Sequence, residues 1–285
     1  MKREIVVAEQ AGYCFGVRRA LDMAKEHLTK TDRKVYSLGP LFHNPQVMRE
    51  LQEKGLAQAD SVEDVHEGVL VIRSHGVEKG VLEEVRAKGL EIVDATCPFV
   101  KNAQRLAHKL SDENYQLVIV GEAHHPEVRG ILSYATKEAL VVGSAEDLDV
   151  ASLGSKVGIL AQTTQSFNNF AEVVTAVLRH AYECRVYNTI CNATASRQAG
   201  AVELAATVDA MFVVGGKNSA NTTRLAELCR AAGASTHHIE TPDEITPDMI
   251  RGKRRIGITA GASTPHAQVE QVQKTLEKMS EEMKE

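Results

Sequence analysis

Three cysteines recur at comparable places along the chain, and this repetition constrains the fold more than any other feature. Cys14, Cys97 and Cys191 lie 83 and 94 residues apart, and each stands between a short apolar run and a helical pattern. A strand–helix unit repeated at this interval is typical of an α/β module. Threefold repetition can bring one loop from each module to a common centre, so we expect the three thiols to meet there.

Two further strand-like runs follow each cysteine, and each run ends in a polar loop. The first loops centre on His43, His125 and Asn221, and the second loops on His75, Thr163 and Ser263. The runs 117–120 and 211–214 are apolar throughout, as expected for parallel strands buried on both faces. We therefore predict an α/β fold of three pseudo-symmetric modules with mainly parallel sheets.

Three domains are expected, although no Pro-, Gly- or Ser-rich linker marks their boundaries. Each domain carries one of the three cysteines and its own set of polar loop residues. The domains are 1–90 with Cys14, His43 and His75, 91–183 with Cys97, His125, Glu127 and Thr163, and 184–285 with Cys191, Ser219, Asn221 and Ser263.

Charge and composition exclude several classes of partner. The chain has 33 Lys and Arg against 38 Asp and Glu, a net charge of −5, and no stripe of aromatic and basic residues. We therefore expect no nucleic-acid partner. No apolar run reaches membrane-spanning length, and the N-terminal residues lack a signal-peptide pattern, so we expect a cytoplasmic protein without a membrane partner. Cysteines in such a protein are typically thiols or metal ligands.

The three strand-end cysteines are interpreted as ligands of a metal centre. A lone cysteine after a strand is usually a small buried apolar residue, but three at matching places reverse that expectation. Structural zinc sites favour C-x-x-C pairs, which this chain lacks. Thiolates also hold iron–sulfur cubanes, and three of them leave one of the four irons open to substrate. Cys184 and Cys229 lack the strand-end placement and are interpreted as structural.

The remaining polar loop residues suggest an anion site with a proton donor. His43, His75 and His125 occupy equivalent loops, and the third module offers neutral donors. With the N-termini of the following helices, they predict a site for a diphosphate. Glu127 would face thiolates and an anion there, which raises the pKa of a carboxyl and suits it to deliver a proton, with Thr163 as a relay. Arg73 and Lys217 add charge or are simply solvated.

These motifs, in this order, resemble those of the 4-hydroxy-3-methylbut-2-enyl diphosphate reductase family, the last enzyme of the non-mevalonate isoprenoid route. The likeness covers essentially the whole chain. The segments that carry it are Gly12-Tyr13-Cys14, Ser74-His75-Gly76, Asp94-Ala95-Thr96-Cys97-Pro98, His125-Pro126-Glu127, Gln162-Thr163-Thr164, Cys191-Asn192-Ala193-Thr194, Gly216-Lys217-Asn218-Ser219 and Thr259-Ala260-Gly261-Ala262-Ser263.

The resemblance implies a trefoil of the three modules around a central [4Fe–4S] cluster. Cys14, Cys97 and Cys191 would bind three irons, and the substrate hydroxyl would bind the fourth, open one. The allylic diphosphate would be held by His43, His75, His125, Thr163, Ser219, Asn221 and Ser263.

The resemblance also implies the chemistry. Glu127 would deliver protons, aided by Thr163 and His125. Two electrons, from a ferredoxin or flavodoxin, and two protons would remove the hydroxyl as water through an allyl intermediate, giving isopentenyl or dimethylallyl diphosphate. At position 220 this chain has Ala220 where the family often has a second serine. One diphosphate hydrogen bond is therefore missing or comes from a backbone N–H.

Two other functions fit the same residues. A zinc hydrolase would use the three cysteines as ligands, with Glu127 activating a bound water. An iron–sulfur sensor would bind isoprenoid diphosphates without turning them over.

Overall fold

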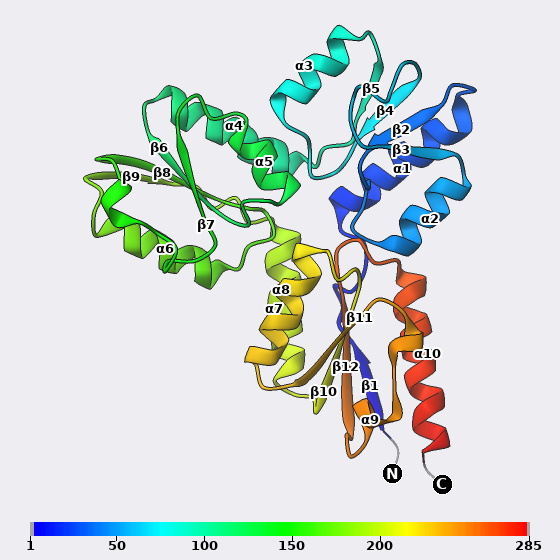
Figure 1. The fold of residues 1–285 in the computed structure, drawn as a ribbon. Coiled ribbons are helices and arrows are strands. Elements are labelled where there is room, and N and C mark those ends of the chain that lie inside the picture. Colours follow the sequence, from blue (N-terminus) through cyan, green and yellow to red (C-terminus); the bar gives the residue numbers. More distant parts are fainter. Residues whose placement is uncertain (1–2, 284–285) are drawn as a thin grey trace. The chain divides into compact units, whose positions relative to one another are not determined.

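A computed structural model describes residues 3–283 of the chain, which form three four-stranded parallel sheets with helices between the strands (Figure 1). The predicted α/β fold of three parallel-sheet modules is confirmed. The chain divides into two compact units. The first contains residues 3–17, 42–49 and 192–283, and the second contains residues 18–41 and 50–191.

The first unit contains a single sheet, with helices on both of its faces. Its strands, in spatial order, are β1 (Glu4–Val7), β12 (Arg255–Ala260), β10 (Ala210–Val214) and β11 (Ser235–Ile239). Its helical segments are α7 (Asn192–Ala205), α8 (Ala220–Ala231), η2 (Pro242–Glu244), α9 (Pro247–Ile250) and α10 (His266–Glu282).

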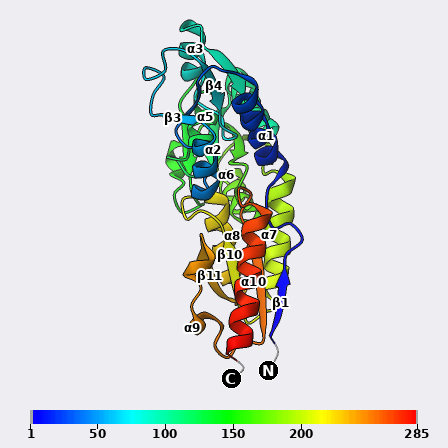
Figure 2. The same cartoon turned by 90° about the vertical axis from the view of Figure 1, so that its right-hand side faces the viewer.

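Strand β10 shows why these strands are continuously apolar. Met211 and Val213 pack with α7 and α8 on one face, whereas Phe212 and Val214 pack with α10 on the other. Helix α10 also runs along β12 and β1, which come from opposite ends of the chain (Figures 1 and 2). Successive side chains point to opposite faces of the sheet, so a strand that is covered on both faces is apolar at every position.

The second unit contains two sheets. One has the order β3 (Leu56–Ala59), β2 (Val35–Leu38), β4 (Val69–Ile72), β5 (Glu91–Asp94). The other has the order β7 (Ala139–Val142), β6 (Gln116–Val120), β8 (Lys156–Ala161), β9 (Glu183–Val186). The helical segments of the second unit are α3 (Lys79–Ala87), α4 (Pro98–Asp112), α5 (Pro126–Leu132), η1 (Val150–Ser152) and α6 (Phe167–Leu178). Helices α1 (Phe15–Lys30) and α2 (Pro45–Glu53) begin in the first unit and end in the second.

The strand before each cysteine is an edge strand, and it pairs with the strand whose polar loop comes second in the repeat. Strands β5 and β9 pair in parallel with β4 and β8, and β1 pairs with β12. Residues 91–94 and 183–186 therefore belong to the sheet of the preceding module. The boundaries expected after residues 90 and 183 place nearly all of these residues in the following module instead. The division of the chain into three domains stays a prediction.

Among residues 3–283, no helix combines the length and the apolar character needed to cross a bilayer.

Candidate functional site

The three cysteines share one backbone arrangement. Each stands at the start of a helix, and its backbone N–H donates a hydrogen bond to a carbonyl in the loop after the neighbouring strand. The pairs are Cys14 to Ala262 at 3.1 Å, Cys97 to Ser74 at 2.9 Å and Cys191 to Thr163 at 3.1 Å. The equivalence suggested by the sequence is therefore present in the hydrogen bonding of each cysteine.

This arrangement suits thiolate ligands. All three cysteines are half-buried, and α1, α4 and α7 begin at the next residue. The N–H of Val17, in the first turn of α1, donates to the Sγ of Cys14 at 3.4 Å. Helix N-termini stabilise negative charge, so these positions favour sulfur in its ligand form.

The other two cysteines are placed differently. Cys184 lies within β9, and burial raises the pKa of its thiol. Cys229 is fully buried in α8, where burial raises the pKa of its thiol to about 11. Both positions disfavour the thiolate, in line with the structural role expected for them.

Glu127 and Thr163 form a buried pair at the ends of two neighbouring strands, β6 and β8. The Thr163 N–H donates to Oε1 of Glu127 at 2.6 Å, and its hydroxyl donates to Oε2 at 2.9 Å. Only 1% of Glu127 is exposed. Burial raises the pKa of Glu127 to about 7, which outweighs the two hydrogen bonds that favour the carboxylate. The side chain can therefore hold or release a proton near neutral pH.

Two of the three predicted histidines lie together in the same unit. The His75 and His125 rings are 5.5 Å apart with an angle of 78° between their planes. His125 precedes α5, and its Nδ1 accepts a hydrogen bond from the Glu127 N–H at 3.1 Å. A neutral His125 ring therefore carries its proton on Nε2. The adjacent His124 is exposed.

Gln104, which the sequence did not single out, lies between the loop that carries His75 and α5, the helix that follows His125. A Cβ atom on Gly76 would lie 2.8 Å from its Nε2, and one on Gly130 of α5 would lie 3.3 Å from the same atom. Gly76 also has a φ of +73°, which few other residues adopt. The buried amide of Gln104 thus separates this loop from α5. Its position on the buried face of α4 is the sequence signal that could have identified it.

In the first unit, the loops after β10 and β12 close against the segment that carries His43. The Ser263 hydroxyl donates to the His43 carbonyl at 3.3 Å. A Cβ atom on Gly216 would lie 2.4 Å from that same carbonyl oxygen, so only glycine fits there. Ser219 begins α8, and its hydroxyl accepts a hydrogen bond from the Thr222 N–H at 3.4 Å. His43, Ser219 and Ser263 therefore belong to one arrangement of loops.

Asn221 of this unit has a buried side-chain amide that makes no hydrogen bond within the described part of the chain. It is 6% exposed, and neither its amide nitrogen nor its amide oxygen has a hydrogen-bond partner among residues 3–283. Buried polar atoms are nearly always paired, so an unpaired amide indicates a place for a ligand. Asn221 thus has the property expected of a substrate-binding residue.

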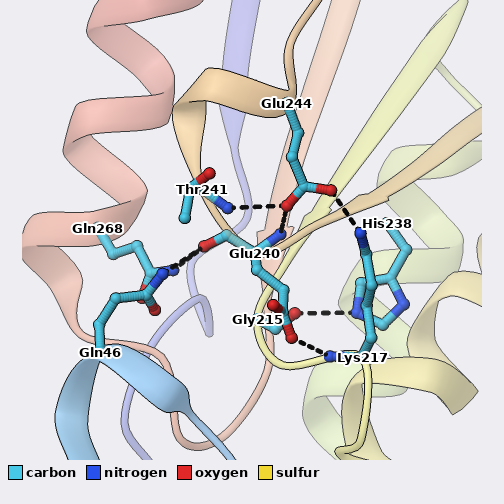
Figure 3. A network of polar contacts seen from close by, with 8 residues as sticks. All are labelled: Gln46, Gly215, Lys217, His238, Glu240, Thr241, Glu244 and Gln268. Atoms are coloured by element: carbon cyan, nitrogen blue, oxygen red, sulfur yellow. Dashed lines mark hydrogen bonds and ion pairs between the residues drawn. The ribbon is translucent and has the colours of Figure 1, made fainter. Parts of the chain in front are cut away.

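Glu240 joins two of these segments (Figure 3). Its carboxylate accepts the Lys217 N–H at 2.7 Å, and its carbonyl accepts the Gln46 side chain at 3.2 Å as well as the Gln268 amide. Glu244 pairs with the Lys217 ammonium at 2.5 Å. Lys217 therefore forms an exposed ion pair with Glu244, and Glu240 joins the loop of Lys217 to the segment that follows His43. No motif in the sequence indicated this network.

Arg197 supports the loop before Cys14. It is buried, and its guanidinium donates to the carbonyls of Gln10 at 3.1 Å and Gly12 at 2.7 Å. A long side chain from α7 thereby shapes the backbone that leads to a cysteine at the other end of the chain.

Comparison with known proteins decides the family. The model of the family described as LytB protein matches residues 5–277. This chain belongs to the LytB family. Two relatives, each named 4-hydroxy-3-methylbut-2-enyl diphosphate reductase, come from Geobacter metallireducens and Geotalea uraniireducens. The first is 51% identical over 269 residues, which cover 94% of this chain and 95% of the relative. The second is 48% identical over 279 residues, which cover 98% and 99%.

Solved structures extend the similarity to the LytB fold. A structure described as (E)-4-hydroxy-3-methyl-but-2-enyl diphosphate reductase, the terminal enzyme of the non-mevalonate pathway, is 44% identical and matches with a TM-score of 0.71 over 97% of this chain and 99% of that one. The E-1-hydroxy-2-methyl-but-2-enyl-4-diphosphate reductase of Plasmodium falciparum is 25% identical, with a TM-score of 0.90 over 97% and 88%. The family resemblance stated from the motifs is confirmed.

The donor set of this chain fits the iron–sulfur dependence of LytB proteins. Three equivalent cysteines are half-buried and placed at helix starts, whereas the surroundings of the remaining two disfavour thiolates. Sulfur donors of this kind suit iron–sulfur clusters.

Proposed function

We propose that this chain reductively removes the hydroxyl group of 4-hydroxy-3-methylbut-2-enyl diphosphate, as its LytB relatives are named for doing. One observation carries the proposal. Thr163 donates twice to the buried Glu127 carboxyl, while its own carbonyl accepts the N–H of Cys191. A single residue thus joins a metal-ligand candidate to a proton donor whose pKa is about 7. A reduction that consumes protons needs such a connection.

The proposed reaction balances with two electrons and two protons. The carbon–oxygen bond of the hydroxyl group breaks, one proton leaves with that oxygen as water, and the second proton forms a new carbon–hydrogen bond. Protonation at either end of the three-carbon unit gives isopentenyl or dimethylallyl diphosphate. Glu127 would supply the protons. Thr163 and His125 would orient its carboxyl group and assist the proton transfer.

Cys14, Cys97 and Cys191 would hold a [4Fe–4S] cluster with one open iron. When bound, the cluster would supply electrons and a Lewis-acid iron. The protein's own contribution is to hold the substrate, to keep water out and to place the proton.

The diphosphate would be held by hydrogen bonds from the side chains that the family resemblance implies, namely His43, His75, His125, Thr163, Ser219, Asn221 and Ser263. Asn221 gives the strongest support, because its amide is unpaired among residues 3–283 and would gain partners from a bound ligand. The electrons would come from a ferredoxin or flavodoxin in the cytoplasm.

Anaerobic purification followed by iron and sulfide analysis tests the proposal. A brown protein with about four irons and four sulfides per chain, which converts the proposed substrate with dithionite and methyl viologen, is the expected result. A colourless protein with bound zinc would contradict it and indicate a hydrolase. A cluster-loaded protein that binds the substrate without turnover under any reductant would also contradict it and indicate a sensor.

A further inference from the structure

A basic groove lies beside Cys97 in the second unit, and its lining does not include His75, His125 or Glu127. It has a volume of about 380 Å³, and its lining includes Arg86 of α3, Thr96, and Lys101, Arg105 and His108 of α4. Thr96 precedes Cys97 directly, so the groove reaches the residue next to a metal-ligand candidate.

Cations outnumber anions around this groove. Lys101 pairs with Asp94 at 2.6 Å, and Arg19 donates to the Thr96 carbonyl at 3.4 Å. In the described part of the chain, neither Arg86 nor Arg105 has a carboxylate within 4.0 Å. Asp94 is the acidic residue in the lining of the groove, and Asp112 lies 3.4 Å from the lining residue His108. Two positive charges therefore remain uncompensated, in a chain whose net charge is −5.

Arg86 and Arg105 give this surface one property of a protein interface, since arginine is enriched there.

We propose that this surface, formed by Arg86, Lys101 and Arg105 with Arg19 bound to the Thr96 carbonyl, docks an acidic ferredoxin that supplies the electrons. The inference rests on the proposed function, because the reaction consumes two electrons that must arrive from outside the chain. Each of two reduced ferredoxins would give up one electron and leave oxidised. The positive surface attracts an acidic carrier and orients it toward Cys97.

The test compares two reductants on the cluster-loaded protein. The double variant Arg86→Glu/Arg105→Glu is assayed with a reduced acidic [2Fe–2S] ferredoxin, and in parallel with dithionite and methyl viologen. For the double variant at low salt, kcat/KM for ferredoxin should fall about tenfold or more, because steering is lost. The rate with methyl viologen should stay at the wild-type value. The wild-type ferredoxin rate should fall as salt rises, and that of the double variant should not.

Lys274→Glu on α10 is the matched control, since it reverses an exposed charge in the other unit and should leave both rates unchanged. Equal losses with both reductants would overturn the proposal and indicate a structural defect. An unchanged ferredoxin rate in the double variant would also overturn it. So would a flavodoxin that depends on the two arginines while ferredoxin does not.

Calorimetric titration of ferredoxin into the cluster-loaded protein separates this inference from the proposed function. Tighter binding to the wild type than to the double variant supports the docking surface, even if the proposed substrate is not turned over. Equal binding to both proteins contradicts the docking surface, even if the substrate is turned over.

Discussion

The polar groups of the two units are satisfied in different ways. In the second unit, the Glu127 carboxyl accepts two hydrogen bonds from Thr163, and His125 accepts one from the chain. In the first unit, the Asn221 amide is buried with neither atom paired among the described residues. The proton-transfer groups are already positioned by hydrogen bonds in the unliganded protein. The ligand-binding amide, by contrast, still has unused donors and acceptors for a ligand.

Replacing a ligand cysteine should have the largest effect on bound iron and activity, and this effect should be similar in the two units. Cys14→Ser in the first unit and Cys191→Ser in the second should each lose most of the bound iron and activity, because a hydroxyl is a poor ligand for iron–sulfur clusters. Iron analysis and the visible absorption spectrum measure this. Cys184→Ser is the matched control and should keep its iron; equal iron loss there would contradict the ligand assignment.

Replacing the buried carboxyl should stop turnover without preventing binding. Glu127→Gln keeps an oxygen that accepts the Thr163 N–H, while its amide nitrogen would donate to the Thr163 hydroxyl, and it has no acidic proton to give. We expect kcat to fall by about 100-fold or more, as is typical when a general acid is lost. Substrate affinity should change only a few-fold by calorimetry. A kcat close to that of the wild type would exclude Glu127 as the proton source.

The raised pKa of Glu127 also predicts how stability depends on pH. Between its ordinary pKa of 4.5 and about 7, the folded protein holds a proton that the unfolded chain has released. This contribution is fully present below pH 4.5, is lost as pH rises through the window, and is gone above about 7. It amounts to about 3 kcal/mol. Urea unfolding of the wild type should show the decline, and Glu127→Gln should lack it.

A paired comparison of Asn221→Ala and Thr163→Val should sharpen the contrast between the units. Asn221→Ala removes an amide without partners, so the free energy of unfolding should hold or rise, while KM rises about tenfold from lost ligand contacts. Thr163→Val leaves one Glu127 oxygen without its donor and should lower the free energy of unfolding by about 1–3 kcal/mol. Thermal or urea unfolding measured beside kinetics checks both. A large destabilisation by Asn221→Ala would show that its amide is paired within the protein.

The smallest effect should come from the network around Glu240. Glu240→Ala removes the acceptor of the Lys217 N–H, which should raise KM a few-fold with little change in kcat. Glu240→Gln keeps an oxygen acceptor there and should recover most of the wild-type KM. If both variants raise KM equally, the carboxylate charge matters more than the position of the loop.

Much of the fold followed from local patterns. The apolar runs at 117–120 and 211–214 are β6 and β10 in essence, and the helices begin directly after the three cysteines. These features depend on side-chain alternation and on polar residues at strand ends, both visible in a short window of sequence. The family was also recognisable from its ordered motifs. The roles of the individual site residues stay predictions.

The positioning residues could not be predicted in the same way. Gln104 matters because Gly76 and Gly130 approach its amide, and Glu240 matters because Lys217 and Gln46 reach it. Their partners are remote in sequence, and a glutamine or glutamate on a helix or after a strand is ordinarily solvated. Only the packing of several segments places Gln104 between neighbouring segments and lets Glu240 join two others.

The amino-acid sequence by itself determined the threefold plan, the placing of a cysteine before each module's helix, and the small polar side chains at the strand ends. These are local properties, set by periodicity and by the types of neighbouring residues. The tertiary structure alone decided that β1 completes a sheet with β12, that Glu127 holds its proton up to about pH 7, and that Asn221 is buried without partners. The physical reason is that strand pairing and loss of water depend on contacts between residues far apart in the chain.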